Sequence, residues 1–257
     1  VCLYASYAQA WLSAGGSLLG VTQDAVEERG LAVGAAEIVG TVKAPNLEKI
    51  TALQPDFVLL TADISGQLAL DESLTALGIA HSYFTADRFE EYVGMMEIFL
   101  RLTGKTELRE ELIEQPEAQI ASARAKAQGK AAPTALLMRA SSAGVSVRAG
   151  DTVAGAILRD LGVKNIAEKY PSLLRELSFE TILQEDPDFI FVTTMGTTEK
   201  AARANLQTLI TKNAAWGSLS AVRENHYFIL QKELYHYKPN EQWGVAYAKL
   251  AEILYGE

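Results

Sequence analysis

The sequence predicts an α/β fold made of two similarly built lobes that one long helix joins. Short apolar segments alternate with helical patterns along all 257 residues, which is typical of parallel sheets with helices on both faces. A sequence pattern from the first half recurs in the second half. The segment between the halves is charged, rich in alanine and free of glycine, as expected of one exposed helix.

The strand candidates are rich in Val, Ile, Leu, Phe and Tyr, and polar residues or glycines flank most of them. They cover residues 1–5, 18–22, 37–41, 57–62, 80–85, 134–139, 145–148, 163–166, 189–194 and 226–231. Helical patterns lie between them, at residues 6–15, 46–53, 66–77, 87–103, 151–161, 178–184, 199–211 and 240–255. The alternation predicts a parallel sheet in each lobe.

Two internal repeats support this division. Glu48 and Glu180 each lie seven residues before a Pro-Asp pair and two residues before an Ile. A helix that ends on Gly and leads into a strand also occurs twice, at residues 10–16 and 156–162. Because both repeats keep their order along the chain, we expect two halves of similar construction.

Residues 105–128 predict a connecting helix about 36 Å long. Pro116 lies inside it and is expected to kink or split it, and Gly129 ends it. We therefore place an N-terminal lobe at 1–104, the connecting helix at 105–129 and a C-terminal lobe at 130–257.

The composition excludes several classes of protein. With 23 Lys and Arg against 32 Asp and Glu, the net charge of −9 argues against a nucleic-acid or anionic-membrane surface. The single Cys excludes an intrachain disulfide and a Cys-rich zinc site. No apolar run approaches the roughly 18 residues that cross a bilayer. The chain opens inside a strand-like segment, so we interpret it as a mature segment from which signal and anchor are absent.

Signatures of enzymes are missing. The sequence has no HExxH, GxSxG, CxxC or complete P-loop motif, and His81, His226 and His236 lack the spacing of metal ligands. We assign no catalytic residue and no metal site. An enzyme or metallocluster-binding protein on the same two-lobed fold remains the alternative, although the chain has no Cys or His cluster to hold such a cofactor.

A set of motifs runs through the chain in a fixed order. They are Asn46-Leu47-Glu48-Lys49-Ile50 with Leu53-Gln54-Pro55-Asp56, Asp160 to Ala167, Leu177-Ser178-Phe179-Glu180 with Asp186-Pro187-Asp188, Trp216 to Val222, and Tyr235 to Asn240 with Trp243. The ordered set resembles the solute-binding proteins of ABC importers for ferric siderophores, haem and cobalamin, the class III periplasmic binding proteins, over essentially the whole chain. The resemblance implies two α/β lobes with a ligand cleft between them.

The resemblance also implies a function. Such a protein captures a solute outside the cytoplasm and delivers it to the transmembrane subunits of an ABC permease, without catalysis and without a cofactor. We expect a monomer, located in the periplasm or held at the cell surface as a lipoprotein. The preferred solute is a ferric siderophore, haem is the second choice, and cobalamin remains an alternative.

The candidate ligand-binding residues follow the carboxyl ends of predicted strands, where ligands of open α/β sheets bind. They are Tyr4, Tyr7, Thr61, Arg88, Arg139, Ser141, Arg148, Met195, Tyr235, His236 and Tyr237. A guanidinium at Arg139 or Arg148 can bind a carboxylate, a catecholate or a haem propionate through paired hydrogen bonds, or it can form an internal salt bridge instead. The segment 235–237 offers either phenolate and imidazole groups for contact with iron or the wall of an apolar pocket.

Glu48 and Glu180 are the candidate docking residues. In the family that the sequence resembles, one acidic residue per lobe meets arginines of the permease, and the motif positions fall on these two glutamates. Two negative charges, one per lobe, would fix the docking register. The alternative is that each Glu lies early in a helix because the helix dipole favours it there.

Overall fold

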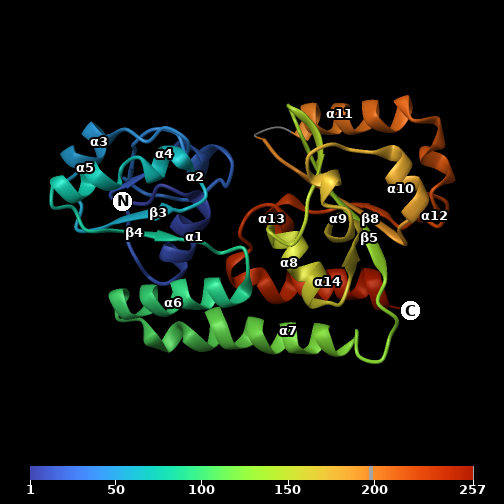
Figure 1. Ribbon diagram of the computed structural model, residues 1–257. Helices are drawn as coiled ribbons and strands as arrows, with labels where there is room; N and C mark the ends of the chain where they lie inside the picture. The colour runs from blue at the N-terminus through green and yellow to red at the C-terminus, as the bar shows by residue number, and fades with distance from the viewer. Residues whose placement is uncertain (197–198, 257) are drawn as a thin grey trace. The chain divides into compact units, whose positions relative to one another are not determined.

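The computed structural model describes residues 1–196 and 199–256. The chain divides into two compact units, unit 1 from Val1 to Gln115 and unit 2 from Pro116 to Glu257, each drawn in Figure 1. The boundary falls inside the segment predicted to be the connecting helix. Both units mix helices with mainly parallel strands, so the predicted α/β class is confirmed.

Unit 1 holds two parallel strand pairs. They are β1 (Gly20–Val21) with β2 (Glu37–Ile38), and β3 (Val58–Thr61) with β4 (His81–Phe84). Cys2 links the pairs through single bridges to Val21 and Leu59. The strand predicted at residues 1–5 is therefore reduced to one paired residue, because the first helix already begins at Ala5.

The helices of unit 1 pack on both sides of these strands. They are α1 (Ala5–Ser13), α2 (Gln23–Glu27), α3 (Leu47–Ala52), α4 (Ser65–Leu68), α5 (Asp71–Ala76) and α6 (Phe89–Thr103). The helix predicted at 66–77 is thus two short helices, and α2 was not predicted. A buried cluster around Leu3, Ile50 and Leu60 forms part of the core. In Figure 1, α3 and α6 lie on opposite sides of β3 and β4.

The sheet of unit 2 has the order β6-β5-β8-β9, and β7 also pairs with β5. The strands are β5 (Thr134–Ser141), β6 (Gly144–Val147), β7 (Lys164–Asn165), β8 (Phe189–Thr194) and β9 (Tyr227–Ile229). All pairs are parallel except β5 with β6, which is antiparallel and departs from the prediction. The two residues between β5 and β6 allow only a hairpin, since a parallel connection needs a long crossover.

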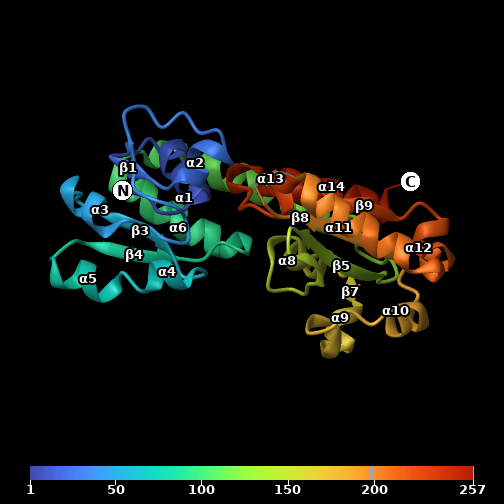
Figure 2. The same ribbon diagram turned by 90° about the horizontal axis from the view of Figure 1, so that it is seen from above.

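Helices cover both faces of this sheet. They are α7 (Gln115–Ala125), α8 (Val153–Asp160), α9 (Ile166–Lys169), α10 (Phe179–Glu185), α11 (Glu199–Lys212), α12 (Ser220–Arg223), α13 (Lys232–Tyr235) and α14 (Trp243–Tyr255). Short 3-10 helices span Thr106–Leu108 in unit 1 and Pro171–Leu174, Ala214–Ser218 and Asn240–Gln242 in unit 2. Leu136 and Met138 of β5 pack with residues of α9 to α12 in one core cluster. Figure 1 shows α10 and α14 on opposite sides of β5 and β8, and Figure 2 gives the second view of each unit.

Pro116 does not split the helix in which it lies. The chain is helical from 109 to 125, and a π-helical turn at Glu110–Glu114 comes just before the proline. Because Pro116 has no N–H, it cannot donate to the carbonyl of Leu112, four residues earlier. The buried hydroxyl of Tyr92 donates to that carbonyl instead, at 2.9 Å. The predicted break is thus a local change of helical pitch, with the orphaned carbonyl satisfied from α6.

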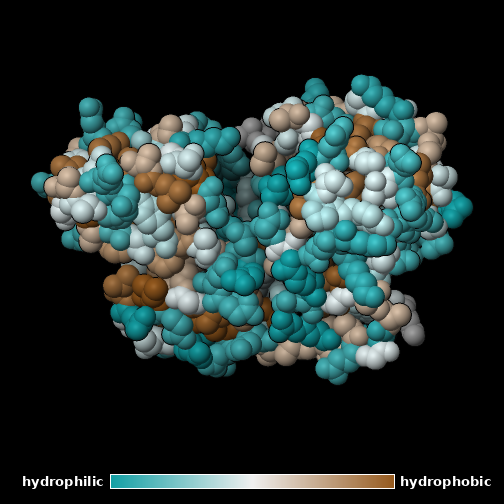
Figure 3. All heavy atoms as spheres, in the orientation of Figure 1, coloured by the Kyte–Doolittle hydropathy of each residue, from teal (hydrophilic) through white to brown (hydrophobic). Residues whose placement is uncertain are grey.

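The surface of unit 1 exposes scattered apolar side chains. Figure 3 shows hydrophobic groups over α6, where Leu102 is 58% exposed. Single exposed apolar residues are normal on a folded protein.

Across residues 1–196 and 199–256, we find no helix with the length and apolarity that crossing a membrane requires.

Candidate functional site

The carboxyl ends of the unit 1 strands gather three of the predicted ligand residues. Tyr4 is half-buried just before α1, and its ring lies 4.8 Å from that of Tyr7. The Tyr7 hydroxyl donates to the Phe84 carbonyl at 3.0 Å and contacts the Thr61 hydroxyl at 3.5 Å. Tyr7 and Thr61 are both fully buried, and burial raises the pKa of Tyr7. Their hydroxyls join neighbouring strand ends, which argues against direct ligand contact, whereas Tyr4 keeps accessible surface.

Arg88 lies at the start of α6 with an exposed side chain. Its Nη2 and Nε contact the Glu91 carboxylate at 2.8 and 3.2 Å, and this pairing lowers the pKa of Glu91 against the effect of burial. The same carboxylate accepts from the backbone N–H groups of Asp87 and Arg88. The guanidinium is therefore oriented at the N-terminus of α6 by its own helix.

In unit 2, Arg139 is half-buried in β5, and its partners in register are Ser146 of β6 and Thr193 of β8. Arg148 follows β6, and its Nη2 lies 3.3 Å from Asp151. The predicted alternative of an internal salt bridge thus holds for part of Arg148, while its Nε is buried without a hydrogen bond to any residue described. Ser141 closes the β5–β6 hairpin, where its hydroxyl contacts the Gly144 carbonyl and accepts from the Ala143 N–H. The hydroxyl of Ser141 is occupied by this turn, which argues against a ligand contact.

Four basic side chains converge on His236. We define them as the basic group: Arg139, Arg148, Lys232 and Lys238. Each acts electrostatically on the imidazole, and Lys232 and Lys238 are only 7% and 4% exposed. Lys232 donates to the Gly196 carbonyl at 2.5 Å, and its Nζ lies 4.6 Å from the centre of the Tyr237 ring. Positive charge is therefore concentrated beside β5, β6 and α13.

His236 is held neutral at this position. Burial first, and then the neighbouring cations, lower its pKa to about 3. Its Nδ1 is buried and has no hydrogen-bond partner among residues 1–196 and 199–256. The neutral imidazole adds no charge, and two of the cations also face carboxylates, Arg148 at Asp151 and Lys232 near Glu199. The cationic side chains of the basic group favour an anion as the group that this region would bind.

The aromatic residues on either side of His236 differ. Tyr235 is 3% exposed, its hydroxyl donates to the Ala246 carbonyl at 2.9 Å, and burial raises its pKa. This placement argues against the predicted contact of Tyr235 with ligand or iron. Tyr237 is half-buried with its ring 5.6 Å from that of His236.

Met195 follows β8 and is 39% exposed, so its thioether stays available.

The two predicted docking glutamates occupy equivalent places. Each is exposed and is the second residue of its helix, α3 for Glu48 and α10 for Glu180. The caps are made by the residues before them: Asn46 accepts from the Lys49 N–H at 2.9 Å, and Ser178 accepts from the Thr181 N–H at 3.3 Å. Neither glutamate forms an ion pair or hydrogen bond with another residue in the described part of the chain. Capping therefore does not need these carboxylates.

No group of three or more His, Cys, Asp and Glu able to hold a metal occurs among the residues that the structure places. His81 contacts Asp71 at 3.1 Å, and His226 stacks on Phe189 with ring centres 4.6 Å apart. Both histidines thus serve local packing and hydrogen bonding.

Lys232 was not among the residues predicted from the sequence. The available signal was its position directly after the strand predicted at 226–231, at the carboxyl end of the sheet, where the structure begins α13. Lysine is rarely buried, so composition gives no hint that this one lies 7% exposed against Tyr237.

Comparisons with known proteins agree with this fold. A family model described as "Periplasmic binding protein" matches residues 1–234. The iron-uptake system-binding protein of Bacillus subtilis is 27% identical over 218 residues, which are 84% of this chain and 66% of that protein. The chain thus spans just under two thirds of that relative's length.

Solved structures show the same fold at lower identity. Staphylococcus aureus IsdE in complex with heme matches with a TM-score of 0.78 and 16% identity, over 98% of this chain and 97% of that one. S. aureus SirA in complex with staphyloferrin B matches with a TM-score of 0.71 and 21% identity, over 99% and 90%. At these identities the likeness concerns the fold.

Proposed function

We propose, starting from the fact that the chain belongs to the periplasmic binding protein family, that it is the solute-binding component of an ABC importer for an iron complex. The family is one of binding proteins, so the activity is capture and delivery without catalysis. The B. subtilis relative, named for iron uptake, and the similar structures with heme and staphyloferrin B support an iron complex as the solute.

The observation that carries this proposal furthest is the basic group around the neutral His236. Iron chelators and haem present carboxylate, catecholate or propionate oxygens, and charged donors bind such oxygens about twice as strongly as neutral donors do. Arg139 projects from a central strand, and Arg148 and Lys238 act on the same imidazole. An anionic ferric siderophore therefore fits unit 2 best, with Tyr4 and Arg88 as the candidate contacts of unit 1.

Haem is the second candidate solute. Met195, 39% exposed after β8, offers a thioether, and the half-buried Tyr237 offers a phenol oxygen. Both groups are common axial ligands of haem iron. If haem is the solute, the basic group binds its propionates. His236 is neutral at pH 7 and is a further candidate ligand of the haem iron.

Delivery uses Glu48 and Glu180 as the docking residues for arginines of the permease. Their exposure, their equivalent helix positions and the absence of partners within the described chain support this role. We place the protein outside the cytoplasm as a monomer, either in the periplasm or anchored as a lipoprotein.

A thermal-shift screen tests the solute class. Ferric citrate-type and catecholate chelates, haemin and cobalamin are added to the purified chain at pH 7. A ligand present at 100 times its Kd adds about 2.7 kcal/mol to the free energy of unfolding, which is a shift of about 5 °C for a chain of this size. We expect an anionic ferric chelate to give the largest shift. A shift with cobalamin alone would overturn the proposal.

A further inference from the structure

The side chain of Gln67 lies between the carboxyl end of β3 and the segment 1–4 at the start of the chain. Gln67 belongs to the short helix α4 and is fully buried. We propose that it is a positioning residue of the unit 1 half of the solute site, where it holds the backbone that carries Tyr4. The inference rests on the proposed transport function and adds to it a residue that sets solute affinity without touching the solute.

Two backbone bonds pair the start of the chain with β3 in parallel register. The N–H of Leu59 donates to the Val1 carbonyl, and the N–H of Leu3 donates to the Leu59 carbonyl, each at 2.9 Å. In a regular parallel ladder, the next bond would run from the Thr61 N–H to the Leu3 carbonyl. Instead, the Thr61 N–H donates to Gln67 Oε1 at 2.9 Å, and Gln67 Nε2 donates to the Leu3 carbonyl at 2.6 Å. The amide takes the place of one ladder bond and keeps the two strand ends one amide group apart.

The same amide also anchors the loop that follows β2. Gln67 Nε2 donates a second hydrogen bond to the Val42 carbonyl at 3.0 Å. Gly66 allows this approach, because a Cβ at that position would lie 1.9 Å from the Lys43 carbonyl oxygen. The hydroxyl of Tyr83 in β4 donates to the backbone carbonyl of Gln67 at 3.2 Å. Gln67 therefore ties together the start of the chain, the loop after β2, β3 and β4.

These bonds fix the position of the Tyr4 ring in two ways. The Leu3 carbonyl belongs to the peptide group that precedes Tyr4, so its bond to Gln67 orients that group. The carbonyl of Tyr4 itself accepts from the Tyr7 N–H at 3.0 Å, at the start of α1. The Tyr4 ring lies beside the Tyr7 ring, whose hydroxyl contacts that of Thr61. The backbone of Tyr4 and the neighbour of its ring therefore both depend on the strand end that Gln67 holds.

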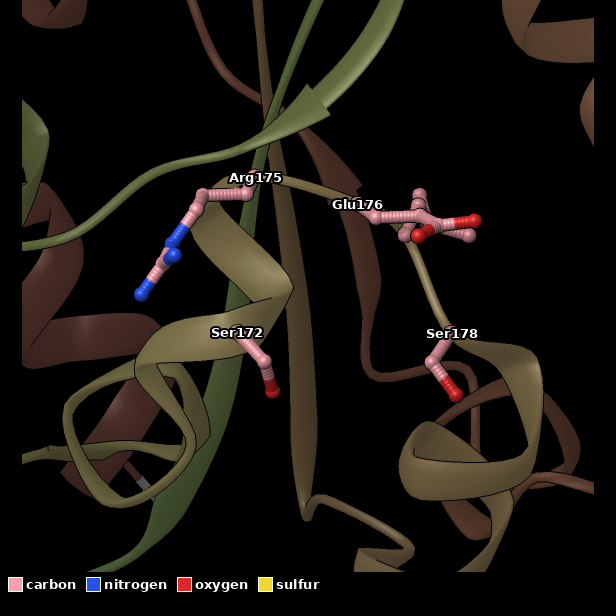
Figure 4. Close-up of a pocket in the computed structure, with 5 residues that line it drawn as sticks. Ser172, Arg175, Glu176 and Ser178 are labelled. Carbon is pink, nitrogen blue, oxygen red and sulfur yellow. The ribbon is translucent and has the colours of Figure 1, made fainter.

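A buried amide is an unfavourable way to join two strands, since a direct ladder bond needs no polar side chain in the core. Arg175 and Glu176, which line the hollow of unit 2 shown in Figure 4, are exposed and can bond to water. Gln67 is 0% exposed, and its amide makes its three bonds inside unit 1. Departures of this kind from a regular pattern are expected at functional sites. This one lies at the carboxyl ends of the strands, where ligands of open α/β sheets bind.

Gln67→Met tests the inference, because it keeps nearly the same length and removes all three amide bonds. Gln67→Asn keeps the amide on a side chain one methylene shorter, which cannot reach Thr61 and Leu3 together, and it is measured in parallel in case Gln67→Met does not fold. The matched control is Tyr92→Phe, which removes a buried hydrogen bond of unit 1 that joins α6 to Leu112. Affinity is measured by calorimetry with whichever of ferric citrate, a ferric tris-catecholate and haemin binds the wild type most tightly.

We expect affinity to fall about tenfold in both Gln67 variants and to stay within about twofold in Tyr92→Phe. Tyr4→Ala should lower affinity about tenfold in the wild-type background but no more than about twofold in Gln67→Met, since the ring has then already lost its position. Arg139→Ala, in unit 2, should lower affinity by the same factor in both backgrounds. Equal effects of Tyr4→Ala in the two backgrounds, or unchanged affinity in both Gln67 variants, overturn the inference.

A measurement without ligand separates this inference from the proposed function. A fluorotyrosine placed at position 4 reports the surroundings of that ring by fluorine NMR. We expect a single resonance in the wild type and in Tyr92→Phe, and a shifted or split resonance in Gln67→Met. An unchanged resonance in Gln67→Met overturns the inference whatever the protein binds. If the resonance changes as expected but the wild type binds none of the iron complexes, the transport of an iron complex is contradicted, and the role of Gln67 in holding Tyr4 stands.

Discussion

Exchange of His236 for Gln should remove a defined part of the pH dependence of folding. An unfolded chain has a histidine pKa of about 6.5, whereas the folded chain holds that of His236 at about 3. As pH falls below about 6.5, His236 binds a proton in the unfolded state but not in the folded state. The contribution of His236 to the free energy of unfolding is therefore present above the histidine pKa of the unfolded chain. It is lost as pH falls toward the pKa of the folded chain. Between pH 7 and pH 5 the loss amounts to about 2 kcal/mol.

Urea denaturation of the wild type and of His236→Gln at both pH values measures this loss. Gln is uncharged, and all other titrating groups are common to both proteins. We expect the wild type to lose about 2 kcal/mol more than the variant between pH 7 and pH 5. Equal pH dependence of the wild type and His236→Gln would refute the electrostatic picture of the basic group.

Three further outcomes follow from the structure. Arg139→Ala should weaken binding of an anionic ferric chelate by about 1.5–3 kcal/mol in calorimetric titration while unfolding stays cooperative; unchanged affinity with a large loss of stability would make Arg139 structural. The double variant Glu48→Ala with Glu180→Ala should reduce uptake of labelled chelate in cells far more than either single change, with solute affinity intact; normal uptake by the double Lys variant contradicts docking through these residues. Tyr92→Phe leaves the buried Leu112 carbonyl unpaired and should lower the free energy of unfolding by about 1–3 kcal/mol; a stability equal to that of the wild type would show that water replaces the hydroxyl.

The sequence predicted most strands from short apolar runs and the longer helices from the period of their apolar face, whereas the strand expected at 1–5 is one paired residue. The segments at 189–194 and 199–211 match β8 and α11 to within one residue. The short elements escaped prediction. A helix of four or five residues, such as α2 or α13, is too short to show a period and forms only because the surrounding packing holds it.

The candidate site was predictable in its position and only partly in its members. The carboxyl ends of strands pointed to Arg139 and to the segment 235–237, and the structure surrounds His236 with basic side chains. The same rule also selected Tyr7 and Tyr235, whose hydroxyls bond to carbonyls in the core. Side-chain direction depends on three-dimensional packing, so the sequence could not separate a tyrosine that faces a ligand from one that serves the core.

Direct titration of the purified chain with an anionic ferric chelate tests the central claim, that this protein captures an iron complex through the basic group of unit 2. Calorimetry is performed at pH 7 with ferric citrate, with haemin and with cobalamin, at low and high salt. We expect saturable 1:1 binding of an anionic iron complex, with an affinity that falls as salt increases and falls in Arg139→Ala. Saturable binding of cobalamin with no binding of any iron complex, or iron-complex affinity that neither salt nor Arg139→Ala changes, would contradict it.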